Sequence, residues 1–290
     1  MNMSEYYGGE YFYDDQTKTL EFKRYCGLFS NVSVMMHLFS ELKLNNKYPE
    51  KIHTNLTEYK GINLYDFLYD IDNSKLDSWK NYDMDVTRQF RIGTAVNLYG
   101  FGTSRHQINL DFTSAMMDTY LNPSNLAKIR EEEIIKKYGI DVKDGTFVWW
   151  RKTDKTREIN WYRQDARYPS IDDVLKLTSD DKFVYFQTDD IEIYNEVSKY
   201  KNVKLLNVLP IDKNNTTGFH ILAKSVNIDD FSKTYNQTFE EYLINLLAMT
   251  IIASRCRKFV GYPGNISLYV CLLRKNFDNV FFFKNHEEFY

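Results

Sequence analysis

A cluster of charged side chains follows an apolar stretch near the middle of the 290-residue chain. The stretch Thr146–Trp150 has the composition of a buried strand, and Arg151, Lys152, Lys155 and Glu158 follow it. An arginine offers a planar fork that suits phosphate, and a lysine offers a mobile point charge. Fixed cations of this kind stabilise the charge that grows on a diphosphate leaving group. The segment therefore fits either a diphosphate site or a solvated surface turn.

Two adjacent carboxylates, Asp189 and Asp190, follow the apolar stretch Phe183–Gln187. An aspartate at the start of a helix commonly accepts backbone hydrogen bonds as an N-cap. Alternatively, one member of this pair orients a cation or a ribose hydroxyl. Both interpretations are open on the residues alone.

Two glycine-containing loops precede predicted helices. The segment Phe259–Ser267 contains Gly261 and Gly264, and the segment Cys26–Asn31 has the same form in the first half of the chain. Backbone N–H groups at a helix N-terminus bind anions, and glycine lets a diphosphate approach closely. The later segment is neither a P-loop nor a G-x-G-x-x-G dinucleotide motif. It indicates an anion site only in combination with other features.

The second half of the chain alternates between predicted strands and helices. Strands are expected at 146–150, 183–187, 203–208, 258–260 and 280–283. Helices are expected after caps at Ser170 and Thr238, over 191–200, and from Ser267. This alternation predicts parallel β-α-β units and a doubly wound domain over about residues 141–284. Ligands bind outside the carboxyl ends of such strands, so we expect Arg151, Asp189 and Gly261 along one rim.

The first half is less regular. We expect a strand over Thr19–Tyr25, a tight loop over Cys26–Asn31 and a helix over Val32–Leu42. A further helix begins after Pro123 with Ser124 as its cap, and Gly139 ends it. Its apolar residues Leu126, Ile129 and Ile134 are expected to face inward.

Composition excludes several classes of protein. A net charge of −3, from 37 basic and 40 acidic side chains, argues against broad nucleic-acid binding. Cys26, Cys256 and Cys271 form no C-x-x-C pair, so neither a disulfide framework nor a zinc site is expected. The near-apolar stretch Leu243–Ala253 is too short for a bilayer, which takes roughly 20 residues, and the N-terminus lacks a signal-peptide pattern. We therefore expect a cytoplasmic protein without membrane insertion.

Four segments together resemble the fucosyltransferase superfamily, which includes core α1,6-fucosyltransferases, bacterial nodulation fucosyltransferases and protein O-fucosyltransferases. That family has, in order, a glycine loop, a strand ending H-x-R-R-x-D-K, a strand ending T-D-D and a late G-x-x-S-S/N-x-S segment. This chain shows the same order at Cys26–Asn31, Val148–Lys155, Phe183–Asp190 and Phe259–Ser267. The resemblance spans about residues 20–275.

The resemblance implies an α/β protein of the GT-B type, with two Rossmann-like domains facing across a cleft. The corresponding division here is an acceptor-side domain over 1–140 and a nucleotide-sugar-binding domain over 141–290. It also implies an inverting, metal-independent glycosyltransferase that needs no cofactor beyond its donor. The absence of a targeting pattern favours a bacterial or viral enzyme among these. GDP-fucose is the first expectation for that donor, and a glycan hydroxyl is the expected acceptor.

Residue by residue, the resemblance implies that Arg151 holds the diphosphate with Lys152 beside it, and that Lys155 assists the leaving group. Glu158 lies near the family's catalytic base, and Asp165 is the second candidate for that role. The remaining donor contacts carried over are Asp189, Asp190, Gly264, Asn265, Ser267, Gly27, Ser30 and Asn31.

Two departures from the family keep alternatives open. Trp149 replaces the family's histidine, and no acid lies near Thr250, where the core-fucosylating branch has a guanine-reading acid. An indole can stack on guanine or uracil alike. A UDP-sugar donor such as UDP-xylose is therefore an alternative. A non-catalytic nucleotide- or sugar-binding protein is an alternative of another class.

Other polar residues are expected to have structural roles. His37 is interpreted as a core or helix-face histidine, and His106 as a loop residue. The sequence Asp83-Met84-Asp85 resembles a D-x-D metal motif but follows no apolar strand, so we expect a loop. No His/Asp/Glu group has metal-ligand spacing.

Overall fold

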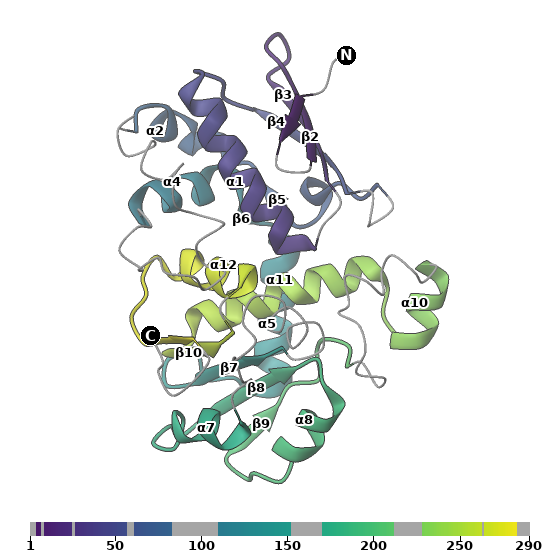
Figure 1. The fold of residues 1–290 in the computed structure, drawn as a ribbon, viewed down its shortest axis with the longest axis vertical. Helices are drawn as coiled ribbons and strands as arrows, with labels where there is room; N and C mark the ends of the chain where they lie inside the picture. The colour runs from purple at the N-terminus through teal and green to yellow at the C-terminus, as the bar shows by residue number, and fades with distance from the viewer. Residues whose placement is uncertain are drawn as a thin grey trace, which may run out of the picture. The chain divides into compact units, whose positions relative to one another are not determined.

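A computed structural model describes residues 4–6, 9–24, 27–56, 61–82, 110–151, 170–211, 228–262 and 264–282. The chain forms two compact units (Figure 1). Unit 1 comprises Met1–Lys128 and Gly264–Asn276, and unit 2 comprises Ile129–Pro263 and Phe277–Tyr290.

Unit 2 is built on a parallel sheet of five strands. These are β7 (Thr146–Trp150), β8 (Val184–Thr188), β9 (Val203–Leu205), β10 (Lys258–Gly261) and β11 (Val280–Phe282). Their order across the sheet is β11-β10-β7-β8-β9, and every neighbouring pair is parallel. The chain moves outward from β7 in one direction and then returns to the other side of β7. The predicted doubly wound sheet is confirmed, and its topological switch point lies between β7 and β10.

Helices cover both faces of this sheet. They are α5 (Asn125–Tyr138), α7 (Ile171–Lys176), α8 (Ile191–Val197) and α11 (Phe239–Arg255). A further helix, α10 (Ile228–Tyr235), packs on the start of α11 through Phe231. Val148, Trp150, Val184 and Phe186 pack against α7 and α8 in one buried cluster. Figure 1 shows α11 on the other side of the sheet. Capping boxes begin α7 at Ser170 and α11 at Thr238, as expected.

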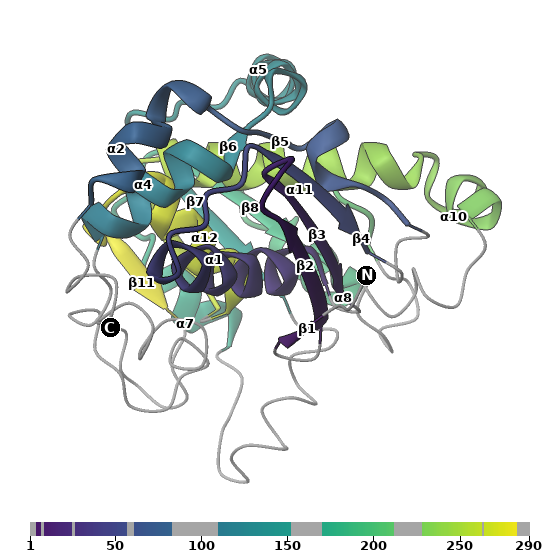
Figure 2. The same ribbon diagram turned by 90° about the horizontal axis from the view of Figure 1, so that it is seen from above.

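Unit 1 contains a mixed sheet of four strands, β1 (Ser4–Tyr6), β2 (Gly9–Asp14), β3 (Thr19–Arg24) and β4 (Lys51–Asn55). The first three are antiparallel, and β4 is parallel to β3. The parallel pair is connected through α1 (Leu28–Leu44), which forms one β-α-β unit. Figure 2 shows this sheet and α1 from above.

Short elements complete unit 1. They are η2 (Leu64–Asp66), β5 (Tyr69–Asp70), η3 (Asn73–Lys75), α2 (Leu76–Lys80), α4 (Leu110–Tyr120), β6 (Asn122–Pro123) and α12 (Asn265–Arg274). The ring centroids of Phe29 on α1 and Tyr269 on α12 lie 4.9 Å apart. Lys275 at the end of α12 forms an ion pair with Asp118 of α4, at 2.7 Å.

The compact units differ from the expected boundary at residue 140 in two places. Most of α5 groups with unit 2, because Arg130 donates to Asn245 of α11 at 3.2 Å and Glu131 forms an ion pair with Arg255. The helix α12 groups with unit 1 because it packs on α1 and α4. The expected roles of the two halves as acceptor side and donor side stay predictions.

Two local expectations were wrong. Helix α1 begins at Leu28, so Leu28–Asn31 is its first turn and not a loop. Leu28 and Phe29 are buried apolar residues, and the amide of Asn31 donates to the Gly27 carbonyl at 3.0 Å. In α5, Leu126 and Ile129 are each 46% exposed, although Ile134 is buried as expected. The buried face of α5 instead includes Glu131, whose charge is satisfied by Arg255.

A lysine is fully buried in unit 1. Lys43 Nζ donates to the carbonyl oxygens of Trp79 and Lys80, the latter at 2.9 Å. The amine also lies 4.9 Å from the centre of the Trp79 ring. Burial lowers the pKa of Lys43 to about 8. This side chain ties the end of α1 to the end of α2.

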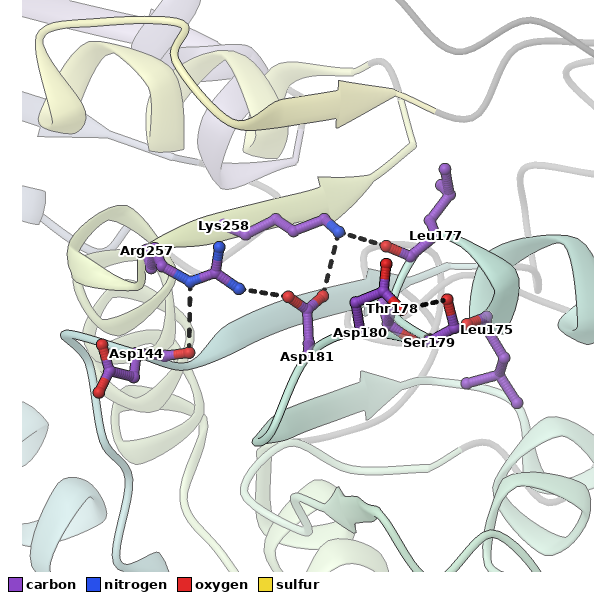
Figure 3. A network of polar contacts seen from close by, with 9 residues as sticks. All are labelled: Asp144, Leu175, Leu177, Thr178, Ser179, Asp180, Asp181, Arg257 and Lys258. Atoms are coloured by element: carbon purple, nitrogen blue, oxygen red, sulfur yellow. Dashed lines mark hydrogen bonds and ion pairs between the residues drawn. The ribbon is translucent and has the colours of Figure 1, made fainter.

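Asp181, Arg257 and Lys258 form a cluster of ion pairs at the amino ends of the unit 2 strands (Figure 3). The buried carboxylate of Asp181, just before β8, accepts from Lys258 Nζ at 3.0 Å and from Arg257 Nη2. Lys258 also donates to the Leu177 carbonyl. Burial by itself raises the pKa of Asp181, but the surrounding hydrogen bonds and charges, those of Lys258 and Arg257 among them, together outweigh it, so the pKa is below its ordinary value. The cluster ties the start of β10 to the segment between α7 and β8.

Asp181→Asn is expected to lower the free energy of unfolding at pH 7 by about 2–4 kcal/mol, because two cations lose a buried anionic partner. Since the folded pKa of Asp181 lies below its unfolded value, its stabilising contribution is complete above about pH 4 and is lost as the pH falls through the folded pKa. Urea denaturation of both proteins should therefore show a difference that shrinks below about pH 4.

The neighbouring exposed carboxylate of Asp180 provides a matched control. Asp180→Asn should change the free energy of unfolding by no more than about 0.5 kcal/mol. Equal losses in the two variants would contradict the role of Asp181.

Candidate functional site

The carboxyl ends of three neighbouring strands form a polar rim on unit 2. Trp149 of β7 is in register with Gly261 of β10 on one side and with Gln187 of β8 on the other. Trp150 is in register with Thr188, so the residues that follow, Arg151 and Asp189, leave the sheet next to each other. The prediction that Arg151, Asp189 and Gly261 share one rim is confirmed. Arg151 and Gly261 flank the switch point, where open α/β sheets bind ligands.

Arg151 and Asp189 form an ion pair at this rim. Arg151 Nε lies 3.7 Å from Asp189 Oδ2, and the two side chains are 24% and 12% exposed. A long, partly exposed pair in contact with solvent contributes at most about 1 kcal/mol to stability. Another anion that replaced the carboxylate in this one pair would therefore have little binding energy to overcome there. The Arg151 guanidinium, with its fork of N–H donors, therefore lies beside the switch point and is oriented by Asp189, which follows the neighbouring strand β8.

Asp190 has a different role from that of Asp189. Its Oδ1 accepts from the amides of Glu192 at 2.8 Å and Ile193 at 3.0 Å, which makes it the N-cap of α8. Its own amide donates to Thr188 Oγ1 at 3.1 Å, and the residue is buried. The helix-cap interpretation therefore fits Asp190, and the cation-orienting interpretation fits Asp189.

Trp149 is a buried neighbour of the rim. It is 4% exposed, and its ring centroid lies 5.7 Å from that of Phe147 on the same strand. Its proposed stacking on a nucleotide base stays a prediction. Thr250 on α11 is also buried, and its hydroxyl donates to the Leu247 carbonyl at 2.6 Å.

In unit 1, the first turn of α1 holds the residues expected in the N-terminal loop. Gly27 is the N-cap of α1, while Ser30 and Asn31 lie in its first turn. Arg24, the last residue of β3, donates to the Ser30 carbonyl at 2.9 Å and to Ser30 Oγ at 3.2 Å. Sequence analysis missed Arg24. The signal was present, because an arginine at the carboxyl end of a strand is the same pattern as Arg151 after β7.

The late glycine segment meets α1 within unit 1. Gly264 is the N-cap of α12, Asn265 is its first residue, and Ser267 is buried. Ser33 Oγ lies 3.0 Å from Asn265 Oδ1 and 2.9 Å from the Phe29 carbonyl, so its one proton can be donated to either. Sequence analysis missed Ser33, which no motif marks. The structure thus links α1 to Asn265 through Ser33 on unit 1, and pairs Arg151 with Asp189 on unit 2.

Several expected residues lie outside the described part of the chain. They are Lys152, Lys155, Glu158, Asp165, His106 and Asp83–Asp85. His37 is buried in α1, where burial lowers its pKa to about 4, so it is neutral at pH 7. Among the described residues, no group of three or more His, Cys, Asp or Glu is arranged to hold a metal ion. None of the described helices has the length and apolar composition needed to cross a membrane.

Asp190→Ala is expected to lower the free energy of unfolding by about 0.5–2 kcal/mol, because two amides at the start of α8 lose their acceptor. Asp189→Ala should change it by less than about 1 kcal/mol, since its ion pair is long and partly exposed. Chemical denaturation of the two single variants tests this division. A larger loss in Asp189→Ala than in Asp190→Ala would reverse the assignment.

The sequence matches no protein-family model and no curated protein. Among solved structures, NodZ α-1,6-fucosyltransferase co-crystallised with GDP is similar over 94% of this chain and 96% of its own, with a TM-score of 0.50 and 10% identity. The same enzyme soaked with GDP-fucose is 9% identical over 92% of this chain and 97% of its own, with a TM-score of 0.49. NodZ from Bradyrhizobium is 9% identical over 89% and 94%, with a TM-score of 0.46. On the first of these comparisons, the chain is an α/β protein with a fucosyltransferase-like fold.

Proposed function

We propose that this protein is a glycosyltransferase that uses a nucleotide-sugar donor, with Arg151 as the residue that holds the diphosphate. The observation that carries the proposal is the Arg151–Asp189 pair at the carboxyl ends of β7 and β8, beside the switch point. Its setting adds support, because the fold resembles that of a fucosyltransferase co-crystallised with GDP. Fold similarity alone does not assign an activity, so the site has to carry the argument.

The proposed chemistry follows from the charges at this rim. In the ligand-free protein, Asp189 balances and orients the Arg151 guanidinium. A bound diphosphate takes its place as the acceptor, since an arginine fork pairs well with phosphate oxygens. As the bond from the anomeric carbon to the diphosphate breaks, its electron pair stays on the leaving oxygen. Arg151 and Lys155 stabilise that charge, with Lys152 as a further cation.

The acceptor hydroxyl needs a base. In this proposal Glu158 takes its proton, with Asp165 as the second candidate, while the hydroxyl oxygen attacks the anomeric carbon from the face opposite the leaving group. This displacement inverts the configuration of that carbon. It uses side chains only, and no metal ion enters the proposed steps.

The donor is proposed to be GDP-fucose, with a UDP-sugar such as UDP-xylose as the alternative and a glycan hydroxyl as the acceptor. UDP is kept as an alternative because Trp149 replaces the family's histidine and because no acid lies near Thr250. Calorimetric titration with GDP and UDP separates the two. Slow hydrolysis of the bound donor without acceptor separates a transferase from a non-catalytic binding protein, which would show none.

Arg151→Ala is expected to weaken binding of the better nucleoside diphosphate by about 10–100-fold, the loss of a charge-assisted hydrogen bond. Arg151→Lys should recover part of the affinity, because it keeps the charge but not the fork. Lys182→Ala, which removes an exposed cation next to the amino end of β8, is the matched control. Calorimetry showing equal affinities in Arg151→Ala and Lys182→Ala would reject Arg151 as the diphosphate ligand.

Glu158→Gln is expected to lower the transfer rate by about 10²–10⁴-fold, the usual contribution of a general base. Donor affinity should stay within a few-fold of the original protein, because the variant keeps the shape of the side chain. Turnover with the acceptor and calorimetry with the nucleotide measure the two quantities. An unchanged rate would remove Glu158 from this role and leave Asp165 to be tested in the same way.

A further inference from the structure

Gln187 is a polar residue in the interior of the unit 2 sheet. It lies near the carboxyl end of β8, in register with Trp149, and is 1% exposed. Its neighbours along β8, Phe186 and Val184, belong to the apolar cluster on the α7–α8 face. Because side chains alternate along a strand, Gln187 and Trp149 project from the other face of the sheet. A buried amide among mostly apolar side chains is stable only when its N–H and C=O groups have hydrogen-bond partners.

The orientation of this amide is set by one hydrogen bond. Gln187 Nε2 donates to the Thr188 carbonyl at 2.9 Å. The opposite assignment of the amide would bring two oxygens together, so Oε1 is the atom that points away. Oε1 is buried, and no donor among the described residues lies within hydrogen-bond distance of it. A buried acceptor without a donor destabilises a fold, and such atoms are uncommon in native proteins.

The strand register places Gln187 near the proposed diphosphate ligand. Asp189 follows Gln187 by two residues, just beyond the end of β8, which is about 7 Å for extended chain. Asp189 forms the ion pair with Arg151. A diphosphate at neutral pH offers acceptors, and the nucleoside attached to it offers N–H and O–H donors. The group that can satisfy Gln187 is therefore on the nucleoside.

We propose that Gln187 determines nucleotide specificity, its Oε1 accepting a hydrogen bond from an N–H or O–H group of the nucleoside in the bound donor. This inference rests on the proposed function of the rim. In this proposal Arg151, after β7, binds the diphosphate, and Gln187, on the neighbouring strand β8, binds the nucleoside. A site with a buried acceptor discriminates strongly against ligands that lack the matching donor.

The test compares the original protein with Gln187→Met, which has a similar shape and no amide. The Met variant should melt at the same temperature or higher, because it removes a buried unpaired oxygen. Calorimetry should show binding of GDP or UDP, whichever binds better, weakened by about 5–100-fold. Pyrophosphate, which has no nucleoside, should bind both proteins equally. Weaker pyrophosphate binding in the variant would mean that the rim itself is disturbed, and this would overturn the proposal.

Modified nucleotides identify the donor group and keep the test valid even if the Met variant does not fold. The ring N-methylated, 2′-deoxy and 3′-deoxy forms of the same nucleoside diphosphate each remove one donor, and for GDP the inosine form removes the exocyclic amino group. One of them should bind the original protein about 10-fold more weakly, and the same change should cost the Met variant less than about 2-fold. Equal affinity for all of them in the original protein overturns the assignment of Gln187.

The failure of this inference can be told from failure of the proposed function. If the original protein binds neither GDP nor UDP, the proposed function and the role of Gln187 are both overturned. If it binds one of them, and Arg151→Ala weakens that binding while Gln187→Met does not, only the role of Gln187 is overturned.

Discussion

Parallel hydrogen bonding between β10, β7 and β8 is the constraint on which the rim depends. Parallel strands in one register end at the same edge of the sheet, so the residues that follow them are neighbours although they are far apart in sequence. Arg151 and Asp189 meet for this reason. The strands are buried on both faces, which leaves little room for polar groups except near their ends. Gln187 is a buried polar residue one position before the carboxyl end of β8.

Three aspartates near β8 show how environment gives one residue type different roles. Asp181 is buried between Lys258 and Arg257 and stabilises the amino ends of the strands. Asp190 is buried and satisfied by the amides of α8. Asp189 has the loosest described contact of the three, a 3.7 Å pair with a cation that is itself partly exposed. In the proposed function a ligand binds beside this longer pair, whereas the amino ends of the strands are held by Asp181 and its two cations.

Much of unit 2 was predictable because its signals are local. The alternation of apolar stretches and capping residues located β7, α7 and α11 to within one or two residues. The position of Arg151 beside Asp189 followed from the rule for parallel sheets. The general α/β class followed from the same evidence.

The features that sequence analysis missed depend on contacts over long distances in the chain. Glu131 is buried and paired with Arg255, while Leu126 and Ile129 of the same helix are exposed. Apolar spacing alone gives the opposite answer. Lys43 is buried, and two carbonyls at the end of α2 accept hydrogen bonds from its side chain. The unpaired oxygen of Gln187 could not be foreseen either, since it depends on the direction of one amide.

The grouping of α12 with unit 1 has a consequence for how the protein can be divided. The chain passes from one unit to the other three times, near residues 128, 263 and 276. An N-terminal fragment that ends near residue 128 lacks the helix that packs on α1 and α4, and the remaining fragment carries that helix without its partners. A hybrid in which unit 2 is exchanged with that of another protein therefore needs three junctions. Single-crossover recombination would produce two incomplete cores.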